Sequence, residues 1–217
     1  RRIDVKNVFS FNRLQSNDMV EGGGSVTLGT EYKIVSQNGL DVFDFNLASV
    51  FRDKINEDLP LKSTIGEKSS NIFGNIGLNP NKNFNFDYDF SLTNDFGRSN
   101  YDQIRTEFKI NNLVNSFEYL EERGLQGDNG YWTNKTKLEL DDKNSISFSK
   151  RRNTKTELNE FYNLIYQYKN DCLTAAIEYN KDYYNDGDLQ PNEQLFFSLT
   201  IVPFTKFNSP NVKDKWK

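Results

Sequence analysis

The sequence contains no histidine and only one cysteine, Cys172. Without histidine, the chain cannot build a Ser-His-Asp or Cys-His catalytic group or a histidine-ligated metal site. A single cysteine cannot form a disulfide within the chain. Asp182, Asp186 and Asp188 resemble a calcium loop only loosely, because the EF-hand spacing is absent. We therefore predict that the chain is not an enzyme and has no catalytic, cofactor-binding or metal-binding residues.

Long apolar runs are also missing. Hydrophobic residues make up only 35% of the chain, its mean hydropathy is −0.77, and no run approaches the ~18 residues of a spanning helix. The net charge of −4 leaves no general basic surface for nucleic acid. Yet there are 18 Phe, 11 Tyr and 2 Trp, too many for a disordered chain. An AT-rich genome explains some of this aromatic content, but not the way in which aromatic and polar residues alternate.

The clearest alternation lies at residues 82–93. One face of this segment would carry Phe84, Phe86, Tyr88, Phe90 and Leu92, while Asn, Asp, Ser and Thr fill the positions between them. Successive side chains on a strand point to opposite faces, so this segment is predicted to be a strand with one apolar and one polar face. Such strands are typical of transmembrane β-barrels, in which one face meets lipid.

The same alternation recurs along the chain. It is found at residues 24–35, 40–52, 71–79, 101–110, 113–121, 130–140, 144–152, 158–168, 172–181 and 193–202. Each segment is close to the ~9–11 residues that cross a bilayer at a tilt. We predict an all-β fold, an antiparallel transmembrane β-barrel of about 11–12 strands. Because barrels of one chain usually have even strand numbers, either residues 1–12 supply a twelfth strand or these strands are the C-terminal portion of a larger barrel. The chain opens on Arg1-Arg2 without Met, as a piece of a longer protein would.

The predicted connections alternate between short and long, as in outer-membrane barrels with tight periplasmic turns and longer outer loops. This rhythm divides the chain into a loop or partial strand region at 1–23, barrel strands at 24–204, and a periplasmic C-terminal tail at 205–217. The polar faces are predicted to line the lumen. The predicted lumen-facing polar residues are Glu31, Lys33, Asp44, Asp87, Asp89, Arg105, Glu107, Lys109, Lys135, Lys137 and Glu139.

The C-terminal third also resembles a known family. Residues 163–179, 183–191 and 195–204 are similar to the C-terminus of the lipopolysaccharide-assembly family LptD, in its alphaproteobacterial branch. Residues 18–32, 58–60 and 69–72 resemble the same family. The resemblance implies a very large barrel in the outer membrane of a Gram-negative bacterium, which passes lipopolysaccharide (LPS) to the cell surface. It also implies contact with outer-membrane lipid, an LptE-like plug lipoprotein, and an LptA-type periplasmic bridge joined through an N-terminal domain.

Two further assignments follow from the resemblance. The last strand would form one edge of a lateral gate, with Leu195, Phe197, Leu199 and Ile201 on it. Cys172 would match the C-terminal cysteine of the family, which forms a disulfide with a cysteine outside this sequence. From the residues alone, Cys172 is equally well an inert small residue in a strand. Lys150, Arg151 and Arg152 are more simply a solvated cluster than a contact for anionic LPS.

Two other functions stay open from the sequence. One is a complete twelve-stranded outer-membrane barrel that acts as a channel or an enzyme, although the missing histidines argue against a hydrolase. The other is a soluble, carbohydrate-binding β-sandwich, in which the apolar faces of two sheets would meet across a core.

Overall fold

The computed structural model describes residues 3–11, 13–14, 21–59, 61, 64–124, 128–183, 192–201 and 205–208. Every named regular element in these residues is a β-strand. No helix in this part of the chain is long and apolar enough to cross a membrane.

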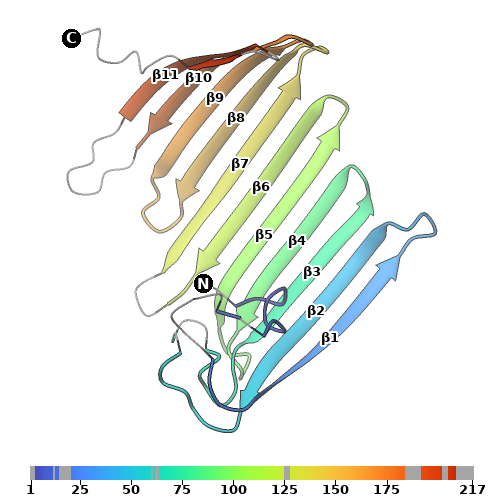
Figure 1. The fold of residues 1–217 in the computed structure, drawn as a ribbon, viewed down its shortest axis with the longest axis vertical. Coiled ribbons are helices and arrows are strands. Elements are labelled where there is room, and N and C mark those ends of the chain that lie inside the picture. The colour runs from blue at the N-terminus through green and yellow to red at the C-terminus, as the bar shows by residue number, and fades with distance from the viewer. Residues whose placement is uncertain are drawn as a thin grey trace. The chain divides into compact units, whose positions relative to one another are not determined.

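The strands follow one another in the sheet in chain order (Figure 1). They form one antiparallel sheet with the order β1 to β12. Their bounds are β1 (Ser25–Val35), β2 (Asp41–Arg52), β3 (Ile72–Asn81), β4 (Phe84–Leu92), β5 (Ser99–Ile110), β6 (Leu113–Glu122), β7 (Asn129–Glu139), β8 (Asn144–Asn153), β9 (Asn159–Lys169), β10 (Leu173–Asp182), β11 (Asn192–Ile201) and β12 (Thr205–Asn208).

The predicted all-β, antiparallel fold is confirmed, and each of β1 to β11 lies within two residues of its predicted bounds. A β-sandwich requires two packed sheets, whereas the described strands form one. The structure adds β12 inside the segment that was expected to be a tail, where residues 205–208 pair with residues 198–201 of β11. Four residues are too few for alternation to be recognised in the sequence.

The described residues at the start of the chain, 3–11, do not supply the twelfth strand. Residues 5–9 form turns, in which the backbone N–H of Val8 donates to the carbonyl of Asp4 at 2.9 Å. The Asp4 side chain accepts from the N–H of Asn7 at 3.1 Å, which further stabilises this local turn. Among the described residues, this segment therefore packs on the sheet without adding a strand to it.

The chain divides into two compact units, which are described separately. Unit 1 comprises residues 1–106 and 119–129, and so contains β1 to β4 and most of β5. Unit 2 comprises residues 107–118 and 130–217, and so contains the turn between β5 and β6 together with almost all of β7 and the strands from β8 to β12.

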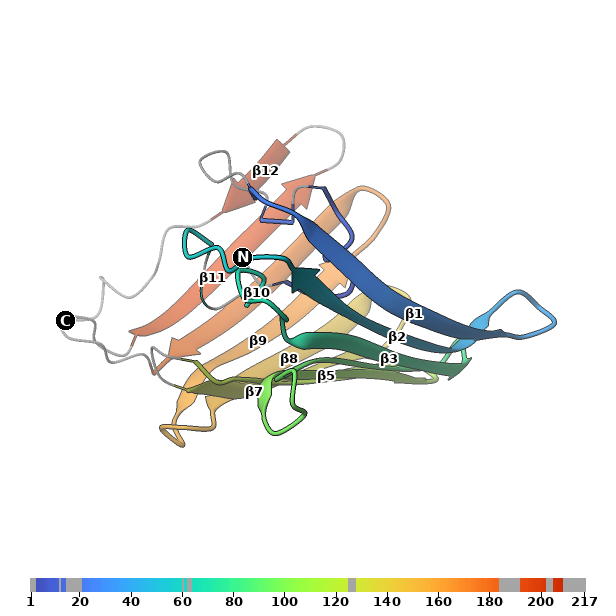
Figure 2. The same ribbon diagram turned by 90° about the horizontal axis from the view of Figure 1, so that it is seen from below.

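Unit 1 has a small hydrophobic core at one end of its sheet. Ile3, Val8 and Leu14 from the N-terminal segment, and Leu59 and Ile65 from the connection between β2 and β3, are buried there. They pack with Ala48, Val50 and Phe73 of β2 and β3. Figures 1 and 2 show the short turn between β1 and β2 at the opposite end of this hairpin from the N-terminal segment and the long connection at 53–71.

Candidate functional site

The strand register gives each unit two faces of different chemistry. In unit 1, one face carries the row Tyr32, Phe45, Ile76 and Tyr88, in which each residue lies opposite the next on the neighbouring strand. A second row beside it contains Ile34, Phe43, Leu78 and Phe86. We call this side the apolar face of unit 1, and the opposite side its polar face.

Unit 2 has an apolar face of the same kind, formed by β8 to β11. One row joins Phe148, Leu164, Tyr179 and Leu195, and the next joins Ile146, Tyr166, Ile177 and Phe197. Seven of these eight side chains are exposed by 37 to 48%. A soluble protein rarely exposes a contiguous apolar surface of this kind, which instead indicates contact with lipid or with another protein.

Glycine allows an aromatic ring to lie flat on the apolar face of unit 1. Gly74 of β3 is paired with Phe90 of β4, and a Cβ atom at Gly74 would lie 2.0 Å from the Phe90 ring. Any larger residue at this position would displace the ring. The predicted aromatic row of β4 is therefore half-buried by its own neighbours, and not by a second layer.

On the polar face of unit 1, three of the predicted lumen residues form one cluster. Arg105 is ion-paired with both Asp87 and Asp89. The amide of Asn75 donates to Asp89 at 2.9 Å and to Asp87 at 3.1 Å, and Arg105 also donates to Gln103 at 2.6 Å. Because two adjacent carboxylates repel each other, the guanidinium between them stabilises the arrangement.

The other predicted lumen residues of unit 1 lie on the same face. Glu31 and Lys33 are opposite Asn46 and Asp44 in the β1–β2 register. The nearest carboxylate partner of Lys33 is Asp41, at 3.1 Å in an exposed ion pair. Such exposed pairs contribute little to stability.

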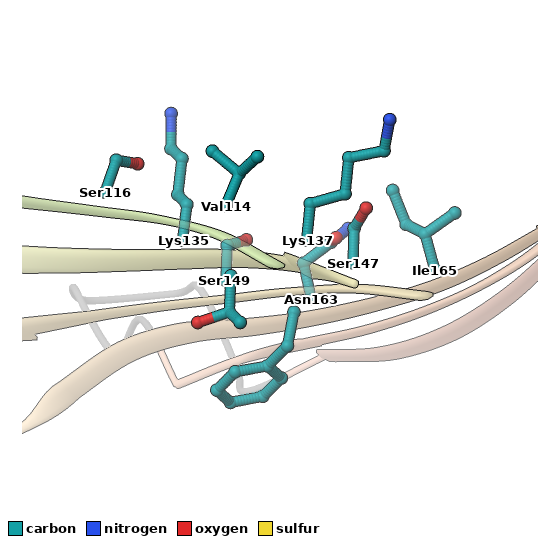
Figure 3. Close-up of a pocket in the computed structure, with 10 residues that line it drawn as sticks. Val114, Ser116, Lys135, Lys137, Ser147, Ser149, Asn163 and Ile165 are labelled. Carbon is teal, nitrogen blue, oxygen red and sulfur yellow. The ribbon is translucent and has the colours of Figure 1, made fainter. Parts of the chain in front are cut away.

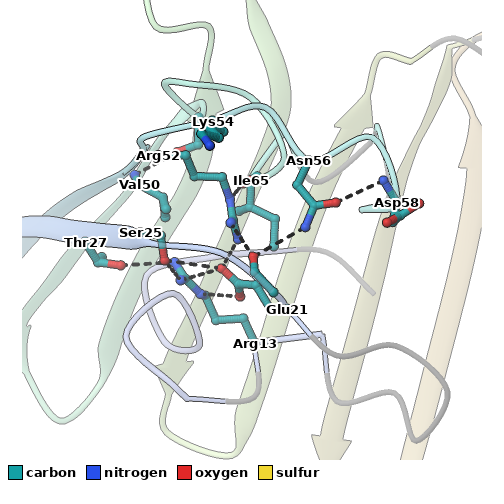
Figure 4. Close-up of polar contacts among 12 residues, drawn as sticks. Arg13, Glu21, Ser25, Thr27, Val50, Arg52, Lys54, Asn56, Asp58 and Ile65 are labelled. Atoms are coloured by element: carbon teal, nitrogen blue, oxygen red, sulfur yellow. Dashed lines mark hydrogen bonds and ion pairs between the residues drawn. The ribbon is translucent and has the colours of Figure 1, made fainter.

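A buried ionic network, which the sequence analysis missed, links the N-terminal segment to the sheet of unit 1 (Figure 4). Arg13 donates to both oxygens of Glu21, at 2.9 and 2.7 Å, and to the hydroxyl of Thr27 at 3.0 Å. Arg52 is ion-paired with the same Glu21 and donates to the carbonyls of Gly22 at 2.9 Å and Ile65 at 2.5 Å. The Arg52 side chain is only 1% exposed, so this network holds three segments together away from water.

The polar face of unit 2 is hollowed over β6 to β9 (Figure 3). Lys135 and Lys137 of β7 lie beside Ser147 and Ser149 of β8, with Asn163 of β9 nearby. Lys137 is ion-paired with Glu139 at 3.0 Å, and the remaining predicted lumen residues, Glu107 and Lys109, pair at 3.3 Å. Hydroxyl, amide and ammonium groups on one surface are able to bind sugars and phosphates.

The predicted gate residues Leu195, Phe197, Leu199 and Ile201 all lie on the apolar face of β11. However, β11 is followed in the sheet by β12, which pairs with residues 198–201. Cys172 lies in the turn between β9 and β10, where it is a free and exposed thiol. With one cysteine in the chain, nothing here supports the predicted disulfide.

Two connections outside the strands carry carboxylates with lowered pKa values. The Asp95 carboxylate accepts hydrogen bonds from the Thr93 hydroxyl at 2.5 Å and the Gly97 N–H at 2.9 Å, which lower its pKa. The Asp141 carboxylate accepts from the N–H groups of Lys143 and Asn144, both at 2.8 Å, and its pKa is likewise lowered. Both side chains therefore stabilise their loops in the charged form.

No group of three or more potential metal-ligating side chains lies within the described ranges. What distinguishes these units is instead the separation of a polar from an apolar face, which suits contact with an amphipathic molecule or a membrane.

A comparison with curated proteins finds no match. The chain does match the family described as LPS transport system D, LptD, over residues 2–148. The match includes the N-terminal segment, while the C-terminal residues that carried the resemblance lie beyond it. Members of this family are components of lipopolysaccharide transport, and the family is not one of enzymes. Because the match covers more than half of the sequence, this chain belongs to the LptD family.

Proposed function

We propose that this chain forms part of an outer-membrane barrel that passes lipopolysaccharide to the cell surface. The observation that supports this most directly is the exposed double row of apolar side chains across β8 to β11, on the side opposite the hydroxyl and lysine groups of the hollow. In this proposal the apolar faces meet membrane lipid and the polar faces line the lumen.

LPS combines a phosphorylated sugar head group with acyl chains, so a path for it needs both kinds of surface. The head group would move along the polar faces, where charged residues such as Arg105, Asp89 and Lys137 lie. Most of these residues are paired with each other, so they provide a hydrated wall without one strongly binding charge. A wall of this kind lets an anionic head group pass without trapping it.

The side assignment is part of the same proposal. Short connections such as 82–83 and 111–112 would face the periplasm, and longer ones such as 53–71 and 93–98 would face outside. The N-terminal segment would then cover the outer end of the polar face of unit 1. The family implies an LptE-like plug and an LptA-type bridge as partners, and a lateral gate next to β11 and β12.

Lipid contact is tested by labelling each face separately. In the intact protein with Cys172→Ser, Leu164→Cys and Asn163→Cys place a fluorescent label on the apolar and the polar face of the same strand. In vesicles with brominated lipids, we expect strong quenching at 164 and weak quenching at 163. Equal quenching at both positions would refute the proposal.

LPS passage is tested by a photo-crosslinking amino acid at Ser149, which lines the hollow, and at Ser145 on the same face of β8. LPS adducts in growing cells are expected at both positions, and they should disappear when LPS delivery to the outer membrane is stopped. Adducts that persist without delivery would mean that the label meets resident lipid and not transported LPS.

A further inference from the structure

One lysine on the apolar face of unit 2 is held between two aromatic rings. The ammonium of Lys150 lies 5.3 Å from the ring centre of Trp132 and 5.3 Å from that of Tyr162. The three residues come from the neighbouring strands β8, β7 and β9, and Lys150 is directly opposite Tyr162 in the register. Both distances are within the range of cation–π attraction, so the lysine is fixed in place by this contact.

The surrounding rings make this site rigid. Phe117 stacks on Trp132 with 6.3 Å between ring centres, and Phe148 stacks on Tyr162 at 6.1 Å. Tyr183 contacts the edge of Tyr162 at 5.6 Å. An ordered aromatic surface costs little further entropy when it binds a ligand.

Within the described residues, two cations on this surface are not balanced by carboxylates. Arg152 lies opposite Trp132 in the β7–β8 register and so adds a second cation to the same face. Neither Lys150 nor Arg152 has a carboxylate partner in the described part of the chain, whereas Lys181, on the same face, is paired with Glu193. A cation beside hydrocarbon is costly unless an anion accompanies it.

The position of the cluster along the strands indicates where that anion would come from. Lys150 is near the end of β8, just before the connection at 154–158, and Trp132 and Tyr162 are near the starts of their strands. This is the end that the proposed function places at the cell surface, where the head groups of the outer leaflet carry phosphate. Aromatic side chains at this level of a membrane protein are stable because one end is apolar and the other is wet.

We propose that Lys150 and Arg152, supported by Trp132 and Tyr162, bind a phosphate group of an LPS molecule resident in the outer leaflet, on the outside of the sheet. This rests on the proposed function, because it requires the apolar face to meet lipid. The ammonium and guanidinium groups donate charge-assisted hydrogen bonds to the phosphate. The exposed row that begins with Phe148 and Leu164 lies along the acyl chains of the same lipid.

The test uses the intact protein in detergent, with binding of defined lipids measured by native mass spectrometry. The variant Lys150→Gln with Arg152→Gln is compared with Lys143→Gln plus Lys169→Gln, which removes the same charge from exposed side chains at the opposite end of the strands of unit 2. For diphosphorylated lipid A, we expect the first variant to bind about tenfold more weakly or worse, the loss expected for charge-assisted hydrogen bonds. The control should bind as the parent does. Lipid A without phosphates should bind weakly and equally to all three proteins.

Three results would overturn this site. Unchanged binding by the Lys150 and Arg152 variant excludes it, and an equal loss in the control shows an effect of net charge alone. Full competition by inorganic phosphate at equal concentration indicates a soluble-anion site and not a lipid site. A heat-modifiable gel band confirms that each variant is folded. Quenching of the label at Leu164→Cys in the same variant reports lipid contact independently, so failure of this site is distinguished from failure of the proposed function.

Discussion

The polar faces of the two units differ in what covers them. In unit 1, the N-terminal segment and the connection at 53–71 bury Ala48, Val50 and Phe73 on the polar face. In unit 2, the polar face is an open hollow beside Lys135 and Lys137. The same alternating strand pattern therefore produces a packed core where a second layer exists and a hydrated surface where the described chain offers none.

The difference shows why one strand can carry apolar residues on both of its faces. Alternation on β2 breaks down at residues 47–51, where Ala48 and Val50 occupy polar-face positions. Strands covered on both faces have continuous apolar runs, and strands covered on one face alternate. Unit 1 shows both kinds within one strand.

The largest effect is expected from Arg52→Ala in unit 1. This change removes both the ion pair to Glu21 and the hydrogen bonds to two backbone carbonyls, all in a buried site. Glu21 would keep its ion pair to Arg13 but lose the one to Arg52, and two backbone carbonyls would lose a donor, so we expect a loss of about 3–5 kcal/mol in stability. Guanidinium unfolding in vesicles measures the free energy of unfolding. Proteolysis at residues 3–14 should also be faster in the variant.

The matched change in unit 2 is Lys135→Ala, on an open polar face. It should change stability by less than about 0.5 kcal/mol. If both variants lose the same stability, the contrast between covered and open polar faces is wrong.

A smaller difference in stability loss is expected when a packed side chain is shortened in each unit. Ile65 is fully buried in unit 1, whereas Ile165 lines the hollow of unit 2 and is only half-buried. Ile65→Ala should cost about 2–5 kcal/mol because it leaves a cavity. Ile165→Ala should cost clearly less in the same unfolding assay. A larger loss at 165 would show that the hollow is filled in solution.

Arg105→Gln tests the charged cluster on the polar face of unit 1. Without the guanidinium, Asp87 and Asp89 repel each other, and we expect a loss of about 1–3 kcal/mol that becomes smaller as salt is added. Lys137→Gln in unit 2 breaks a pair whose members are both about half exposed, and should change stability by less than about 1 kcal/mol. Equal and salt-independent losses would contradict the role assigned to Arg105.

The smallest effect is a pH dependence that the two units should share. The hydrogen bonds that lower the pKa of the Asp95 carboxylate below its ordinary 3.8 also stabilise its loop. This stabilisation is fully present above that pH. This stabilisation is lost as the pH falls through the lower pKa of the folded state, so the loop at 93–98 should loosen below about pH 4.

Asp141 in unit 2 has a pKa lowered in the same direction and should respond in the same way. Amide hydrogen exchange at Gly97 and Lys143, corrected for its intrinsic pH dependence, measures both loops. Asp95→Asn should remove the response at 97 and leave that at 143. Protection that stays constant from pH 6 to pH 3 would disprove this.

Much of the fold could be predicted from the sequence because alternation is a local signal. Residues 82–93 alone define a two-sided strand, and the observed β4 lies within them. The N-terminal packing could not be predicted in this way, since Ile3, Val8 and Leu14 lie in turns and loops and follow neither strand nor helix periodicity. The available signal was a set of apolar residues, Ala48, Val50 and Phe73, at positions of the face that elsewhere carries polar side chains.

The candidate site was predictable in outline only. The sequence placed Asp87, Asp89 and Arg105 on one face, but their ion pairs depend on the register between β4 and β5, which alternation does not specify. The network of Arg13, Glu21 and Arg52 joins residues far apart in the sequence, so no spacing rule could reveal it. The cation–aromatic contact at Lys150 depends on register in the same way.

The short strand β12 has a consequence for the edge of the sheet. A bare strand edge presents unpaired N–H and C=O groups that recruit strands from other chains, which leads to aggregation. By pairing with residues 198–201, β12 occupies that part of the β11 edge with the chain's own backbone. Four residues thus shorten the part of the β11 edge that is open to strand addition by another chain.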